Sequence, residues 1–187
     1  MNARLHTTYK EKIAPVLMNE FKYKNRMQVP RLEKIVLSMG LGRALQDKKL
    51  METALEVLEA ITGQKPVPCQ AKKSVSNFKV REGYQTGAKV TLRGQMMYEF
   101  LDRLINLAVP RVRDFRGLSP SGFDGRGNYS VGLQEIVVFP EINPDRIQHQ
   151  LGMNITIVTT GRNDEEARQL LRHFGMPFRD SQATESN

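Results

Sequence analysis

Residues 88–93 alternate strictly between apolar and polar side chains. Lys89, Thr91 and Arg93 occupy every second position, and small or branched apolar residues stand between them. Because successive side chains of a β-strand point to opposite faces, this pattern predicts a strand with one apolar face and one cationic, hydroxylated face. A sheet built on this strand has one side for a hydrophobic core and one side for a polyanion.

The positive charge of the chain is concentrated in its first half. The net charge is +8, but residues 1–93 hold 18 Lys and Arg against 8 Asp and Glu, whereas residues 94–187 hold 10 against 12. Residues 65–93 contain a single acid, Glu82. This division favours one nucleic-acid surface in the basic half and a different task for the nearly neutral half. A lysine-rich face that is merely solvated stays open as the alternative.

The length and the cysteine content suggest one ordinary cytoplasmic domain. A chain of 187 residues suffices to bury roughly 70% of its unfolded surface in one core. Cys69 is the only cysteine, which rules out an internal disulfide and favours a reducing compartment. We find neither a secretory signal nor the ~20 apolar residues of a membrane span. We therefore expect no membrane contact, one domain over residues 1–180, and a disordered polar tail at 181–187.

Hydrophobic periodicity predicts two well-defined helices. The first covers residues 50–61, between a cap at Asp47 and a stop at Gly63. The second covers residues 96–109 and ends at Pro110. Two further helices are expected at the ends of the chain.

The terminal helices carry recognisable boundary signals. The N-terminal helix is expected to kink or to begin near Pro15, because proline removes a backbone donor. The last helix opens at Asn163, where Asn163 and Glu166 have capping-box spacing, and it closes before Gly175.

Short apolar runs bounded by turn residues predict the strands. One lies near Cys69 and is confined to a sheet edge, because Pro66 and Pro68 cannot donate ladder hydrogen bonds. The others cover residues 31–39, 88–93, 129–133, 135–139 and 153–160. Residues 77–87 are predicted to be a long loop or a hairpin tip, and the glycine-rich residues 111–128 a long excursion that is either ordered or flexible. The irregular interleaving predicts an α+β fold: a two-layer single domain whose mixed, largely antiparallel sheet has its helices packed on one face.

One motif suggests an enzyme, but its details do not fit. Gly40 and Gly42 follow a strand as in a dinucleotide-binding unit, yet Leu45 occupies the position of the third glycine. We therefore expect a tight turn and no cofactor. The three histidines are far apart in the sequence and have no cysteine or carboxylate at ligand spacing, so we expect no metal.

Several segments together resemble the L5 family of ribosomal proteins of the large subunit. They are residues 27–40, 61–66, 71–75, 90–94, 109–119, 123–129 and 139–142. The resemblance runs in order from about residue 5 to residue 179. It implies a non-enzymatic ribosomal protein that binds 5S rRNA in the central protuberance, together with large-subunit rRNA and other 5S-associated proteins.

The resemblance also implies which residues touch RNA. The 5S-binding positions map onto Ser38, Gln64, Thr91 and Arg93, and Ser38 replaces the asparagine usual in the family. Short hydroxyl and amide groups suit the 2′-OH and base edges of RNA, and arginine forks onto phosphate. The nearby Lys72, Lys73 and Lys89 add electrostatic attraction to phosphate that does not depend on the RNA sequence.

Two further contacts follow from the same resemblance. The 77–87 loop, which bears Lys79, Arg81 and Tyr84, faces the P-site tRNA. Residues 114–128 and 141–150 form an intersubunit bridge with protein S-thirteen of the small-subunit head. The charged residues expected there are Asp114, Arg116, Asp124, Arg126, Asp145 and Arg146.

Aromatic residues in the loops have two possible roles. Such rings either stack on exposed bases or anchor their own loops. The candidates are Phe78, Tyr84, Phe115, Phe123 and Tyr129. Two functions compete with the ribosomal one: a free-standing RNA-binding regulator or chaperone and, more distantly, a nucleotide-dependent oxidoreductase.

Overall fold

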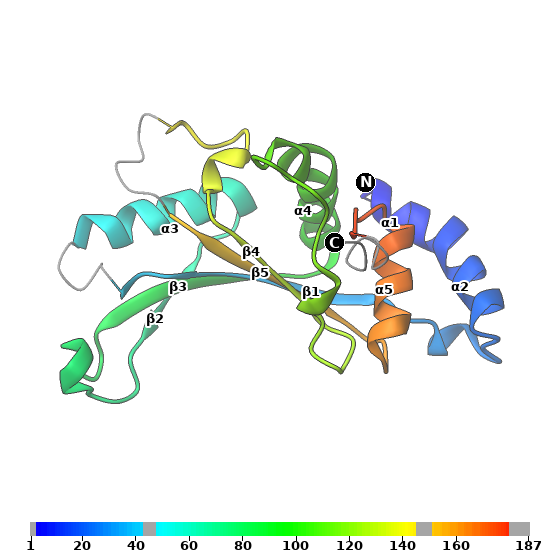
Figure 1. Cartoon of the computed structure of the whole chain (residues 1–187), viewed down its shortest axis with the longest axis horizontal. Helices are drawn as coiled ribbons and strands as arrows, with labels where there is room; N and C mark the ends of the chain where they lie inside the picture. The colour runs from blue at the N-terminus through cyan, green and yellow to red at the C-terminus, as the bar shows by residue number, and fades with distance from the viewer. Residues whose placement is uncertain (1–2, 43–47, 145–150, 180–187) are drawn as a thin grey trace, which may run out of the picture. The chain divides into compact units, whose positions relative to one another are not determined.

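The computed structural model describes residues 3–42, 48–144 and 151–179 (Figure 1). The tertiary contacts fall into two compact units. Of the described residues, unit 1 contains 3–35, 93–131 and 156–179, and unit 2 contains 36–42, 48–92, 132–144 and 151–155. Strands β1 (Leu32–Gly40) and β5 (Met153–Thr159) contribute residues to both units.

Within these ranges, five strands form one sheet in the order β2-β3-β1-β5-β4. The remaining strands are β2 (Val67–Gln70), β3 (Gln85–Leu92) and β4 (Tyr129–Leu133). β2 pairs antiparallel with β3. The N–H of Leu41, just past β1, donates to the carbonyl of Thr86 at the start of β3 at 2.8 Å. The predicted α+β class with a largely antiparallel sheet is therefore confirmed, and β2 is an edge strand as expected.

In unit 2, helix α3 (Lys48–Thr62) packs on the apolar side of β3 (Figure 1). Its stripe of Ala54, Leu58 and Ile61 is completely buried. The helix ends where predicted, because Gly63 adopts a left-handed φ of 69° and donates its N–H to the Glu59 carbonyl at 2.7 Å. The predicted cap at Asp47 lies outside the described residues.

In unit 1, the N-terminal helical segment begins earlier than Pro15. It runs through α1 (Arg4–Thr8), a π-helical turn (Tyr9–Ile13) and α2 (Ala14–Glu20). In the π turn the N–H of Ala14 donates to the carbonyl of Tyr9. The irregularity expected near Pro15 therefore takes the form of a widened turn immediately before the proline.

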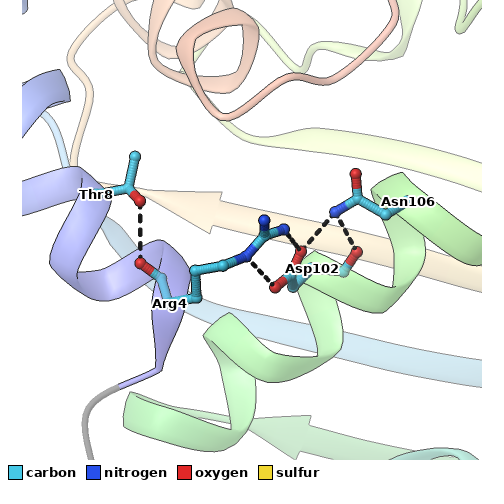
Figure 2. A network of polar contacts seen from close by, with 4 residues as sticks. All are labelled: Arg4, Thr8, Asp102 and Asn106. Atoms are coloured by element: carbon cyan, nitrogen blue, oxygen red, sulfur yellow. Dashed lines mark hydrogen bonds and ion pairs between the residues drawn. The ribbon is translucent and has the colours of Figure 1, made fainter.

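Helix α4 (Gly94–Arg103) lies beside α1 in the same unit. The guanidinium of Arg4 forms a two-pronged ion pair with the carboxylate of Asp102, with Nε 3.0 Å from Oδ2, and the same carboxylate accepts from the amide of Asn106 (Figure 2). Beyond α4 the chain continues through a π-helical turn (Leu104–Ala108) and a 3-10 turn (Val109–Arg111). Pro110 thus sits inside this last turn.

Three local predictions are wrong. Residues 135–139 are not a strand, because Ile136–Val138 forms a 3-10 turn and the N–H of Phe139 donates to the Ile136 carbonyl at 3.2 Å. Periodicity alone does not separate a short apolar strand from an apolar turn. The hairpin tip expected at 77–87 is found between β2 and β3, but its boundary is wrong, because β3 begins at Gln85 and ends one residue before Arg93.

The capping box at the last helix is the third wrong prediction. Helix α5 (Asp164–His173) begins after Asn163, but the Asn163 side chain makes no capping hydrogen bond. The carboxylate of Glu166 instead accepts from the N–H of Arg162 at 2.9 Å. The stop before Gly175 is confirmed by its φ of 92°.

Candidate RNA-binding surfaces

The side chains of β3 alternate as the sequence predicts. Val90 and Leu92 are completely or almost completely buried, whereas Lys89 is exposed and Thr91 is half-buried. The apolar side chains pack toward α3, so the opposite side of the strand carries the amine and the hydroxyl. This register leaves both polar groups available to a ligand.

The neighbouring strand β1 alternates in the same way. Leu37 and Met39 are buried, while Val36 and Ser38 between them are half-buried. Ser38 therefore shares the open face of unit 2 with Lys89 and Thr91. Of the predicted 5S-binding residues, these three are brought together on one surface, which we name the open sheet face.

The edge strand adds a residue that sequence reasoning missed. Val67 pairs directly with Lys89 and is 57% exposed, so it also lies on the open sheet face. Residues paired across an antiparallel ladder share a face. The prolines that assign β2 to the edge do not reveal which residue pairs with Lys89, because register depends on the hairpin geometry.

Gln64 lies outside the sheet, in the connection between α3 and β2. Its side chain is exposed, and its backbone is fixed by the buried Thr62. The Thr62 hydroxyl lies 3.1 Å from the Gln64 carbonyl and 2.6 Å from the Leu58 carbonyl, and it accepts from the Gln64 N–H at 3.3 Å. Thr62 thus fixes the backbone of a predicted RNA-binding residue.

Arg93 belongs to unit 1, where it has an acidic partner. Its backbone is extended, with φ −137° and ψ 164°, and it precedes α4 as the N-cap residue. The guanidinium Nη1 lies 3.6 Å from the Glu33 carboxylate, and the two side chains are 58% and 47% exposed. At this exposure the ion pair is weak. Nothing in the sequence marks Glu33 as the partner of Arg93, because 60 residues separate them.

The connection between β2 and β3 is a hydrogen-bonded loop of residues 71–84, here called the tip loop (Figure 1). Ala71 donates to the Tyr84 carbonyl at 2.8 Å, and Glu82 donates its N–H to the Ser74 hydroxyl at 3.0 Å. The predicted RNA-facing side chains of this loop are all exposed: Lys72, Lys73, Lys79, Arg81 and Tyr84.

The glycine-rich segment predicted for the bridge is ordered by two carboxylates of unit 1. Asp164 accepts from the N–H groups of Gly125 and Gly127 at 3.0 and 2.9 Å. Asp124 accepts from the N–H groups of Arg126 and Asn128 at 2.9 and 3.0 Å, and from the Asn128 amide at 2.7 Å. The Asn128 side chain, followed by these backbone bonds, lowers the pKa of Asp124 below its usual value. The side chain of Arg126 remains exposed.

An aromatic cluster supports the base of this segment. The Phe123 ring lies 4.8 Å from that of Tyr129 and 5.8 Å from that of Phe178. The Tyr129 hydroxyl donates to the Ser119 carbonyl at 2.9 Å, and burial raises the pKa of Tyr129 to about 12. Phe123 and Tyr129 thus act as loop anchors. Of the other three candidates, Phe115 is half-buried, whereas Phe78 and Tyr84 are exposed and stay candidates for stacking.

The other bridge residues are less constrained. Asp114 is exposed and adopts a left-handed φ of 53°, and the carbonyl of Arg116 accepts from the guanidinium of Arg179 at 3.4 Å. Within the described residues, no hydrogen bond joins Asp114 or Arg116 to the turn that contains Asp124. Asp145 and Arg146 lie outside the described residues.

A second basic cluster in unit 1 surrounds Tyr9. The Tyr9 hydroxyl donates to the Pro30 carbonyl at 3.0 Å, and Arg26 reaches the Lys10 carbonyl at 3.5 Å. Burial raises the pKa of Tyr9, and the nearby charges of Arg31 and Arg26 oppose that rise. Arg26 and Arg31 thus lie near Tyr9, and Lys10, Arg26 and Arg31 are all exposed, in a region that the sequence analysis did not single out.

Two classes of site are not found in the part of the chain that the structure describes. No group of three histidine, cysteine or carboxylate side chains there is arranged to hold a metal ion. None of the described helices has the length and apolarity that crossing a membrane requires.

Comparison with known proteins shows the family. Residues 85–178 match the model of the ribosomal L5P family C-terminus, and residues 25–81 match the model of ribosomal protein L5. Three relatives are each described as large ribosomal subunit protein uL5. The one from Anaeromyxobacter sp. (strain Fw109-5) is 58% identical over 179 residues, which cover 96% of this chain and 99% of the relative.

The other two relatives agree closely. The protein of Alkaliphilus metalliredigens is 57% identical over 94% of this chain and 98% of its own length. That of Carboxydothermus hydrogenoformans is 58% identical over the same shares. The chain therefore belongs to the ribosomal protein L5 family: it is a structural protein of the large ribosomal subunit, located in the ribosomes of the cytoplasm, and not an enzyme.

Proposed function

We propose that the open sheet face binds 5S rRNA and helps to attach it to the large subunit in the central protuberance. The observation that carries this proposal is the alternation of β3, which points Lys89 and Thr91 away from the core that holds Val90 and Leu92. Ser38 lies on the same face. An amine and two hydroxyls suit phosphate and 2′-OH groups. Gln64, Arg93, Lys72 and Lys73 extend the proposed contact.

The test compares RNAs and assemblies. We expect the isolated protein to bind 5S rRNA more tightly than an unrelated duplex RNA of equal length at physiological salt. It should also co-sediment with large subunits through a high-salt wash, which a free-standing RNA-binding regulator would not. Equal affinity for every duplex would contradict the proposal.

Two further contacts complete the proposed function. The tip loop, with Lys79, Arg81 and Tyr84, faces the P-site tRNA, and its hydrogen-bonded backbone supports a defined display of these exposed groups. The segment around Arg126 contacts protein S-thirteen of the small-subunit head. Charges of both signs, Asp114 and Asp124 against Arg116 and Arg126, suit a protein partner better than phosphate.

The basic cluster around Tyr9 is a candidate for contact with large-subunit rRNA beyond 5S rRNA. It contains three exposed cations: Arg26 and Arg31, which lie near Tyr9, and Lys10, whose carbonyl accepts from Arg26. Neutralising Arg26 and Lys10 should weaken incorporation of the protein into large subunits and leave its affinity for isolated 5S rRNA unchanged. A loss of 5S affinity would instead assign this cluster to the 5S contact.

A further inference from the structure

The outer end of the tip loop is a tight turn with a fixed backbone. Val75 and Val80 form an antiparallel bridge, in which each N–H donates to the other's carbonyl at 2.9 and 3.2 Å. The N–H of Lys79 donates to the Ser76 carbonyl at 2.9 Å, and Lys79 adopts a left-handed φ of 53°. A non-glycine residue keeps this conformation only where its surroundings fix it.

This turn presents an aromatic ring to solvent. Phe78 is 75% exposed, and among the described residues no other aromatic ring stacks on it. Phe123, at the base of the glycine-rich segment, shows the contrasting case of a loop ring packed on two other rings. Phe78 therefore does not anchor its own loop.

The exposed ring belongs to a loop with an excess of cations. Lys79 and Arg81 closely follow Phe78 in the chain, Lys72 and Lys73 lie earlier in the tip loop, all four side chains are exposed, and Glu82 is the single acid of the loop. A flat ring in a cationic loop matches RNA that offers phosphates together with an unstacked base. A continuous duplex offers phosphates but no free base face, and an apolar protein surface gives no role to the cations.

We propose that Phe78 stacks on an outward-facing base of the RNA that the tip loop contacts. The loop would then recognise a base face as well as phosphate charge. This inference rests on the proposed contact with the P-site tRNA, whose folded loops present such bases, and it identifies the aromatic residue of that contact.

The test uses ribosomes whose only copy of this protein carries Phe78→Ala, Phe78→Leu, Phe78→Tyr or Phe78→Trp. The measured quantity is the dissociation rate of P-site tRNA. Loss of a base stack should raise that rate about 5-fold or more for Ala and also for Leu, which keeps the apolar bulk but not the flat ring. Tyr and Trp should keep the original rate. Met27→Ala, at a 76% exposed residue of unit 1, is the control and should change nothing.

A double variant that removes two charges separates stacking by Phe78 from the contact of the tip loop with tRNA. If Lys79→Gln with Arg81→Gln speeds tRNA release while every Phe78 variant behaves like the original protein, stacking is wrong and the tRNA contact stands. If the Leu variant also keeps the original rate while Ala does not, the contact is apolar and stacking is again contradicted. If neither the charge nor the ring variants alter release, both the tRNA contact and the inference fail.

Discussion

The carboxylate of Glu33 lies 3.6 Å from the guanidinium of Arg93, one residue past the end of β3. This ion pair places an acid beside Arg93, a residue predicted to bind an RNA phosphate. Each phosphate that approaches Arg93 must compete with Glu33 and is repelled by it.

Removing this acid should therefore strengthen RNA binding. We expect Glu33→Gln to raise the affinity for 5S rRNA by about 2- to 5-fold, since an exposed ion pair contributes up to about 1 kcal/mol. Glu11→Gln removes an exposed acid elsewhere in unit 1 and controls for the change in net charge. Equal gains from both variants in a filter-binding titration would mean that the ion pair itself has no influence.

The register of β3 predicts opposite effects for adjacent residues. Thr91→Ala removes a half-exposed hydroxyl and should weaken 5S binding by roughly 1 kcal/mol without changing the melting temperature. Val90→Ala removes two buried methyl groups and should lower the free energy of unfolding by about 2 kcal/mol with little effect on the affinity of the folded protein. Affinity and thermal unfolding are measured on both variants, and the reverse pattern would show that the proposed face is inverted.

Asp164 positions the turn that carries Arg126. Asp164→Ala removes the acceptor for the Gly125 and Gly127 amides, so both amides should exchange with solvent faster, while the amides of β3 keep their protection. Association of the two ribosomal subunits at limiting magnesium should weaken as well, and 5S affinity should stay unchanged. Arg126→Glu, which leaves the turn intact, is the companion variant for the bridge contact. Normal subunit association by both variants would remove this segment from the bridge.

The lowered pKa of Asp124 predicts how this turn responds to acid. Hydrogen bonds from Asn128 and Arg126 favour the ionised carboxylate. Because the folded pKa lies below the unfolded one, the stabilisation is complete above the ordinary value of 3.8 and is lost as the pH falls through the folded pKa. An NMR titration of the Asp124 carboxyl carbon should give a midpoint below 3.8. The Arg126 and Asn128 amide shifts should follow it, and in Asp124→Asn they should not titrate there.

The sequence was sufficient for the elements with strong periodicity. The strand around Val90, the helix that ends at Gly63 and the edge position of β2 were all predicted, because each depends on local alternation, helical spacing or proline chemistry. The failures concern local choices that a sequence pattern leaves undecided. Periodicity does not decide whether Ile136 lies in a strand or a turn, and capping-box spacing does not decide whether Glu166 accepts from Asn163 or, as observed, from Arg162.

In the candidate sites, too, only the features that follow from local geometry could be predicted from the sequence. Lys89 and Thr91 share a face because of strand geometry, so their exposure was predictable. The pairing of Arg93 with Glu33 and of Gly127 with Asp164 joins distant parts of the chain, and no local pattern reports it. The exposure of Phe78 was also undetermined, since a loop phenylalanine serves equally well as an anchor, as Phe123 does.

If 5S rRNA binds through Lys89 of β3 and Arg93 just past the strand, the salt dependence of the affinity should report both cations. If about five phosphates are neutralised, log K should fall against log salt with a slope of roughly −4, and Lys89→Gln with Arg93→Gln should reduce the slope to about −2. Lys10→Gln with Arg26→Gln, which removes two cations from the cluster around Tyr9, should keep the original slope. A folded Lys89 and Arg93 double variant with the slope and affinity of the original protein would show that these two cations do not bind the RNA.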